Sequence, residues 1–101
     1  MTRGTTPTLT FVLGLAPSRF EVLYLTAKQG GRIVFERTLE QVVKNESAKS
    51  VSFRLNQEET LALNEKAPVF VQARGRLADG SALASEMLQL SVAGILKEGV
   101  I

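Results

Sequence analysis

The sequence predicts an all-β chain that folds as an antiparallel, immunoglobulin-like β-sandwich of six to seven strands. Three observations support this. Apolar and polar residues alternate with a period of two through most of the chain, and turn signals interrupt that alternation at intervals typical of a sandwich. The one helix-start signal precedes only a short helical turn near residues 57–63. A small barrel is the alternative. With 101 residues, the chain is expected to form a single domain over 1–101.

The first half of the chain contains a strand over 8–15 and a hairpin. Pro7 opens the first strand, and its inward face is expected to carry Leu9, Phe11, Leu13 and Leu15. The next strand covers residues 19–28. Gly30-Gly31 then supplies the positive φ angles of a tight hairpin turn. In the returning strand over 32–38, we expect the inward residues to be Ile33, Phe35 and Arg37.

The second half is expected to alternate in the same way after an ambiguous stretch over 39–50. A strand over 49–55 leads to Asn56 and Glu59, which have the spacing of a helix capping box. A strand over 69–77 follows, and Asp79-Gly80 predicts a hairpin to a final strand over 82–92.

Composition excludes most chemistry. The chain has no His, no Cys and no Trp, and a single Asp, so it lacks the residues of most hydrolases and of thiol or imidazole metal sites. We therefore expect no enzyme activity, no catalytic residues, no metal and no cofactor. The net charge of +2 is dispersed, which argues against nucleic acid as a partner.

No apolar run is long enough to span a membrane, and the first ten residues do not form a signal peptide. The sequence therefore predicts a product that is cytoplasmic when synthesised and has no membrane partner.

The two terminal segments are the candidate interaction sites. Residues 1–7 form a polar lead and residues 95–101 an apolar tail without an obvious local partner, so both are expected to act as arms that dock on protein partners. Phe70 shares its strand face with polar residues and is a further candidate. The predicted interface residues are Arg3, Thr5, Thr6, Pro7, Phe70, Ile95, Leu96, Val100 and Ile101.

Three segments resemble small proteins encoded by phages and prophages of Gram-positive gut bacteria. They are MTRGTTPTLTF (1–11), LNQEETLAL (55–63) and VAGILKEGVI (92–101). The resemblance implies a structural component of the tail or virion region, a group mostly described as hypothetical, and brings no catalytic residues with it.

Two functions are therefore expected from different classes. The first is a non-enzymatic phage or prophage structural protein that self-associates, or joins other phage structural proteins, through sheet edges and terminal arms. The alternative is a ligand-binding module for a host-surface glycan or protein, for which Phe70 and Tyr24 are the candidate aromatic contacts.

Overall fold

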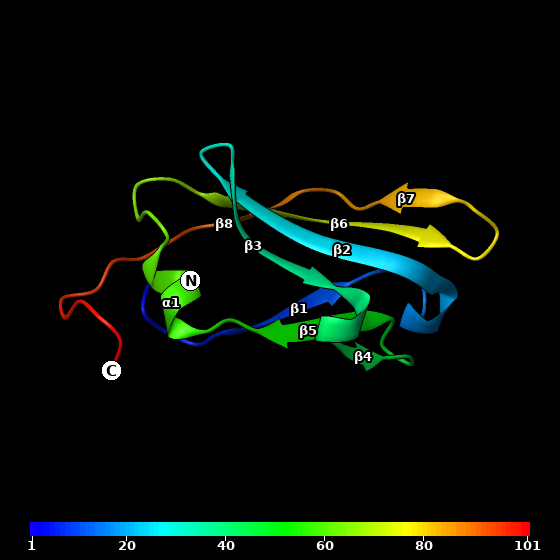
Figure 1. Ribbon diagram of the computed structural model, residues 1–101, viewed down its shortest axis with the longest axis horizontal. Coiled ribbons are helices and arrows are strands. Elements are labelled where there is room, and N and C mark those ends of the chain that lie inside the picture. The colour runs from blue at the N-terminus through cyan, green and yellow to red at the C-terminus, as the bar shows by residue number, and fades with distance from the viewer.

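The computed structural model describes residues 1–101 and consists of two antiparallel sheets packed face to face (Figure 1). The smaller sheet has the order β1-β5-β4, formed by Thr8–Val12, Ser50–Arg54 and Val43–Asn45. In the larger sheet β3 (Arg32–Thr38), β2 (Phe20–Gln29) and β6 (Val69–Leu77) lie in that order. β7 (Ala82–Ala84) and β8 (Leu88–Leu90) both pair with the outer side of β6. The predicted sandwich is confirmed, and the barrel alternative is wrong.

Three connections cross between the two sheets, which gives the sandwich its immunoglobulin-like topology. The first crossing, from β1 to β2, contains the 3-10 turn η1 (Pro17–Arg19). The second, from β3 to β4, contains η2 (Leu39–Gln41). The third, from β5 to β6, contains α1 (Gln57–Leu61), which begins with the predicted capping box of Asn56 and Glu59. All the consecutive strands within a sheet are joined by hairpins or short loops.

The core lies between the sheets and contains 15 buried apolar residues. The period-two pattern placed most of them correctly, because inward residues of β1 and β6 alternate with residues that face outward. In β5, Val51 and Phe53 are buried as expected, but Ser50, expected to face outward, is buried as well. Four of the five phenylalanines are buried there: Phe11, Phe20, Phe35 and Phe53. Both predicted hairpins also form, with Gly30, Gly31 and Gly80 at positive φ.

Ile33 was expected to be buried and is instead 57% exposed. The cause is a β-bulge: Ala27 lies opposite Phe35, but the next residue, Lys28, lies opposite Ile33, so Val34 is an extra residue in β3. The bulge turns the side chain of Ile33 outward while Phe35 stays in the core. Alternation alone does not reveal such an insertion.

The predicted final strand over 82–92 is also wrong in detail, because it is interrupted. Between β7 and β8 the pairing with β6 shifts by one residue, and Ser85 occupies the break. Its backbone N–H donates to the Ala73 carbonyl (2.9 Å), and its Oγ accepts the Ala73 N–H (3.0 Å). This division, together with β4, gives eight strands instead of six to seven.

Candidate protein interface at the terminal segments

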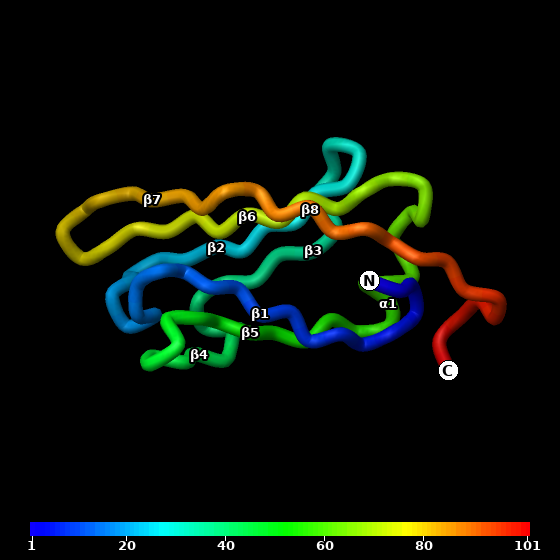
Figure 2. Tube along the Cα trace, turned by 180° about the vertical axis from the view of Figure 1, so that it is seen from behind, coloured from blue at the N-terminus to red at the C-terminus, as the bar shows by residue number.

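The N-terminal segment pairs with the chain beyond β8 (Figure 2, blue beside orange). The Met1 ammonium donates to the Ser91 carbonyl (2.9 Å), the Ala93 N–H donates to the Met1 carbonyl (2.8 Å), and the Arg3 N–H donates to the Ala93 carbonyl (3.0 Å). Thr2 and Ala93 therefore form a parallel bridge. The chain then turns at Gly4, where φ is +72°, and crosses to β1 in the other sheet. In this structure residues 1–3 extend the larger sheet.

Arg3 connects the two terminal segments to α1. Its Nε donates to the Leu63 carbonyl (2.9 Å) and its Nη2 to the Leu61 carbonyl (2.8 Å). Both carbonyl groups lie at the C-terminal end of α1, where basic side chains often bind. Its Nη1 also donates to Oε1 of Glu98 (2.7 Å). This hydrogen bond lowers the pKa of the Glu98 carboxyl group. Only 18% of the Arg3 side chain is exposed, so the guanidinium makes its contacts mainly within the domain.

The other predicted residues of the lead also make internal contacts. The Thr60 hydroxyl donates to the Thr5 carbonyl (2.8 Å), and Arg54 Nη2 donates to the Thr6 hydroxyl (2.9 Å). The Pro7 carbonyl accepts the Leu55 N–H (2.9 Å). These contacts anchor the lead on α1 and β5.

The C-terminal tail, residues 95–101, is held by polar contacts while most of its apolar side chains face outward. Gln57 clamps the last residue, with Ile101 N–H donating to Oε1 (2.8 Å) and Gln57 Nε2 donating to the Ile101 carbonyl (3.0 Å). Ile95 is half-buried near Gly4. The exposed fractions are 105% for Leu96, 89% for Ile101 and 60% for Val100. The domain therefore binds the backbone and charges of the tail and leaves these three side chains exposed.

Phe70 lies apart from the terminal segments. It is 41% exposed on the outer face of the larger sheet, where its neighbours across the strands are Lys28 and Gln89. Tyr24 is exposed on the same face, opposite Arg74. The structure thus brings the two predicted arms together at one end of the molecule but does not bring Phe70 to them.

Sequence reasoning missed the residues that hold this end together. Arg3 and Glu98 are 95 positions apart, and no local pattern joins them. Arg37 and Glu59 form a second pair, with Nη2 donating to Oε1 (2.7 Å) and Nη1 to Oε2 (2.9 Å). The Arg37 guanidinium also lies 5.5 Å from the centre of the Phe53 ring. Hydrogen bonding from Arg37 lowers the pKa of Glu59, whose carboxylate also accepts the Asn56 N–H of the capping box.

No three acidic side chains gather in a way that could hold a metal ion, and the only helices are too short to cross a membrane. The sandwich topology and the terminal cluster define the class of molecule: an immunoglobulin-like β-sandwich with an apolar tail displayed at one end.

No protein-family model and no curated protein matches the sequence. Among solved structures, the chain is similar to the extracellular domain of mouse leukocyte-associated immunoglobulin-like receptor 1, described as a strand-swapped dimer, with 13% identity and a TM-score of 0.49. A second structure, of the immunoglobulin-like domain of that receptor, gives the same values. Each comparison covers 92% of this chain and 84% of the receptor chain. The similarity concerns the fold alone.

Proposed function

We propose that this domain is a non-enzymatic structural protein that assembles with other protein chains through its C-terminal tail. The observation that carries the proposal is the exposure of Leu96, Val100 and Ile101 on a segment that the domain holds through the half-buried Ile95 and through polar contacts. Fully burying an aliphatic side chain of this size is worth about 1.5–3 kcal/mol. Burying three such side chains on one short segment favours association and offsets part of the cost of bringing two chains together.

The polar contacts that fix the tail are easy to exchange for contacts with a partner. The Glu98 carboxylate is 61% exposed, and solvent screens an ion pair at such a site. The tail therefore rests on its own domain without a large free energy of attachment. This is the behaviour expected of a docking arm.

The setting we propose is a phage or prophage particle. It is supported by the resemblance of residues 1–11, 55–63 and 92–101 to small structural proteins of phages and prophages, together with the displayed tail. Mass spectrometry of purified particles from a lysogen that carries the gene tests this setting. Peptides of the chain in the particles support it, and their absence from particles that contain the other structural proteins contradicts it.

The test of assembly is the solution mass of two full-length proteins, measured by light scattering across a range of concentrations. One is the unchanged chain, and the other is the tail variant Leu96→Ser, Val100→Ser, Ile101→Ser. We expect the unchanged chain to form species larger than a monomer and the tail variant to remain monomeric. Circular dichroism and a thermal melt serve as the control, since these side chains are exposed and the variant should unfold like the unchanged chain. Equal association of both proteins would contradict the proposal.

A further inference from the structure

One long side of the sandwich, between β1 and the strands β7 and β8, is open. β1 pairs only with β5, so its other edge has no partner strand. Leu13 N–H donates to the Lys49 carbonyl (2.8 Å) and the Pro7 carbonyl accepts from Leu55, so odd-numbered residues direct their backbone groups toward β5. The N–H and C=O groups of Thr8, Thr10 and Val12 consequently point to the free edge. Figure 2 shows the molecule from this side. Residues 1–3 pair with the chain after β8 and leave the edge along β7 and β8 uncovered.

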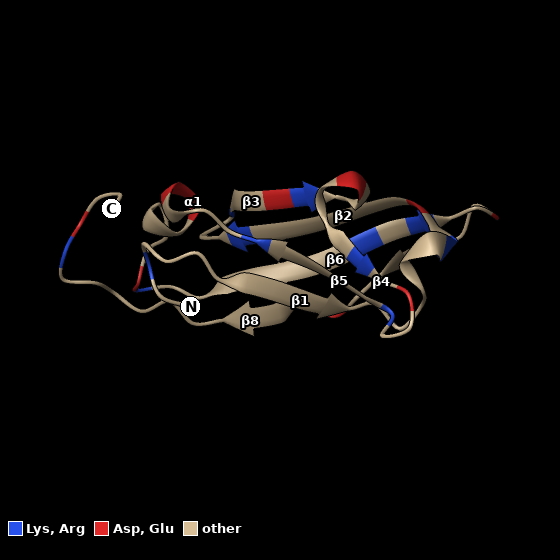
Figure 3. Cartoon of the chain, turned by 90° about the horizontal axis from the view of Figure 1, so that it is seen from below, with Lys and Arg blue, Asp and Glu red and all other residues tan.

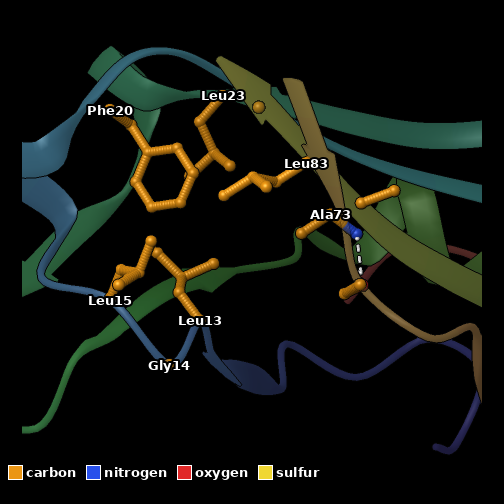
Figure 4. A pocket seen from close by; sticks show the side chains of 10 residues that line it. Leu13, Gly14, Leu15, Phe20, Leu23, Ala73 and Leu83 are labelled. Atoms are coloured by element: carbon orange, nitrogen blue, oxygen red, sulfur yellow. Dashed lines mark hydrogen bonds between the residues drawn. The ribbon is translucent and has the colours of Figure 1, made fainter. Parts of the chain in front are cut away.

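Two hollows with mostly apolar linings lie between the two sheet edges on this side, which we call the seam. The hollow toward the β7 end is a cavity of about 310 Å³, in the lower range of ligand-sized pockets. Leu13, Leu15, Phe20, Leu23 and Leu83 point into this cavity (Figure 4). Toward the β8 end a second hollow of about 150 Å³ lies between Leu9 on β1 and Leu88 on β8. An extended segment with aliphatic side chains is the occupant that fits both hollows and the free backbone groups together.

The seam is also uncharged, which restricts the charge of its occupant. Residues 4–18 contain no charged side chain, and Glu86 is the only one between Asp79 and Lys97 (Figure 3). A strongly charged peptide would lose hydration here without gaining an opposite charge. The tail carries one Lys and one Glu, which cancel, beside its apolar residues.

The tail does not reach the wide part of its own seam. It leaves the domain at the end opposite β7 (Figure 1), and the molecule is 48 Å long. Seven fully extended residues span at most about 25 Å. A second copy placed end to end with the first, however, brings its tail directly to the β7 end of the seam.

We infer that the tail of one copy inserts into the seam of a second copy, where it runs antiparallel to β1 and adds a strand to its free edge. The inference rests on the proposed function and names the surface that the tail binds. Its direction follows from β1, which runs toward the β7 end where the tail enters (Figure 1). Because the tail and the seam are different surfaces, the interface is head-to-tail and extends into rings or filaments.

A mixing experiment with two full-length variants tests this arrangement. The seam variant, Leu83→Lys, places a charge at the rim of the cavity but keeps an intact tail; the tail variant, defined above, keeps an intact seam. We expect each variant alone to be monomeric and an equimolar mixture to form heterodimers by light scattering, because only one of the two interfaces can form. A seam variant that assembles like the unchanged chain, or a mixture that stays monomeric, would overturn the inference.

The outcomes separate the two proposals. If the tail variant is monomeric while the seam variant still assembles, the proposed function stands and the inferred partner surface is wrong. If the tail variant assembles, both are wrong. As a second measurement, a peptide of residues 94–101 is titrated into the tail variant and into the tail variant that also carries Thr10→Pro. That substitution removes a free-edge N–H without removing a hydrogen bond of the fold. We expect at least tenfold weaker peptide binding with Thr10→Pro, and equal binding would overturn the β-strand pairing.

Discussion

The two long sides of the sandwich differ in how their edge strands meet solvent. On one side, β3 carries Arg32, Glu36 and Arg37, and β4 carries Lys44. On the other side, β1 contains no charged residue, and neither do β7 and β8 (Figure 3). Charged side chains on an edge strand oppose the addition of another strand, because pairing would strip their hydration. One side of the sandwich is therefore protected against pairing with another strand, and the other side is not.

Exposed apolar residues occur on both sides, so exposure alone does not distinguish them. Ile33 on β3 is more exposed than Leu83 on β7. Ile33, however, lies in a strand with three charged residues, whereas Leu83 lies over an apolar cavity. The difference between the sides is therefore the combination of a free backbone edge, a hollow and the absence of charge.

The largest expected effect comes from Gly75, which forms part of the cavity wall on the open side. A Cβ added there would lie 2.6 Å from the Phe20 ring and 2.8 Å from the Val22 carbonyl oxygen. We expect Gly75→Ala to lower the free energy of unfolding by about 3 kcal/mol through overpacking, measured by urea denaturation. Gly31→Ala at the β2–β3 turn is the control: its φ is +81° but the space is open, so about 1 kcal/mol is expected. Equal losses would show that the cavity wall adapts freely.

The next largest effect concerns the ion pair that joins the charged side to α1. Arg37→Ala removes the bidentate contact with Glu59, in which both side chains are about 80% buried. We expect a loss of about 2 kcal/mol in the free energy of unfolding, since the carboxylate is left partly buried without its partner. Arg76→Ala provides the contrast, because its pair with Glu21 is long and exposed at 3.4 Å and should be worth less than about 0.5 kcal/mol. Equal losses in the free energy of unfolding for the two variants would mean that the Arg37–Glu59 pair does not stabilise the fold.

A smaller effect is expected when the tail is released. Because the pKa of Glu98 is lowered by Arg3, the contact is fully present above the ordinary glutamate pKa and is lost as the pH falls through the lowered value. We expect two changes to lower the protection factor of the Ile101 amide, which is its intrinsic exchange rate at the given pH divided by its measured rate. They are Glu98→Gln at neutral pH and acidification below the ordinary glutamate pKa. With the tail less firmly held, Glu98→Gln should also assemble a few-fold more strongly. An unchanged protection factor at Ile101 would mean that Glu98 does not hold the tail.

The smallest effect is expected for Phe70→Ala on the outer face of the larger sheet. Phe70 belongs to neither of the sides compared above, so assembly measured by light scattering should not change. A glycan-array screen of the unchanged chain addresses the alternative function. Specific binding that Phe70→Ala abolishes would favour a ligand-binding module over the assembly that we propose.

Local patterns predicted the sandwich well. The alternation that predicted β1, the two glycine turns and the capping box at Asn56 each depend on neighbouring residues, so local sequence contains their signal. The end of β1 was predicted less well, because the strand stops at Val12 and not at residue 15. The bulge at Val34 and the break at Ser85 could not be predicted, since they adjust register between strands. The terminal residues were correctly grouped as candidates, but their contacts join positions more than 40 residues apart. The open seam depends on which strands end up at the sheet edges, and this is a property of the topology.

Concentration-dependent hydrogen exchange of the unchanged chain tests the central claim most directly. The free-edge amides of Thr8, Thr10 and Val12 have no partner in the monomer and should exchange rapidly in dilute solution. As the measured mass rises with concentration, we predict that these amides become protected, while amides at the exposed edge of β3 keep their exchange rates. A rising mass with unprotected β1 amides would contradict the account, because the chains would then be associating through some other surface.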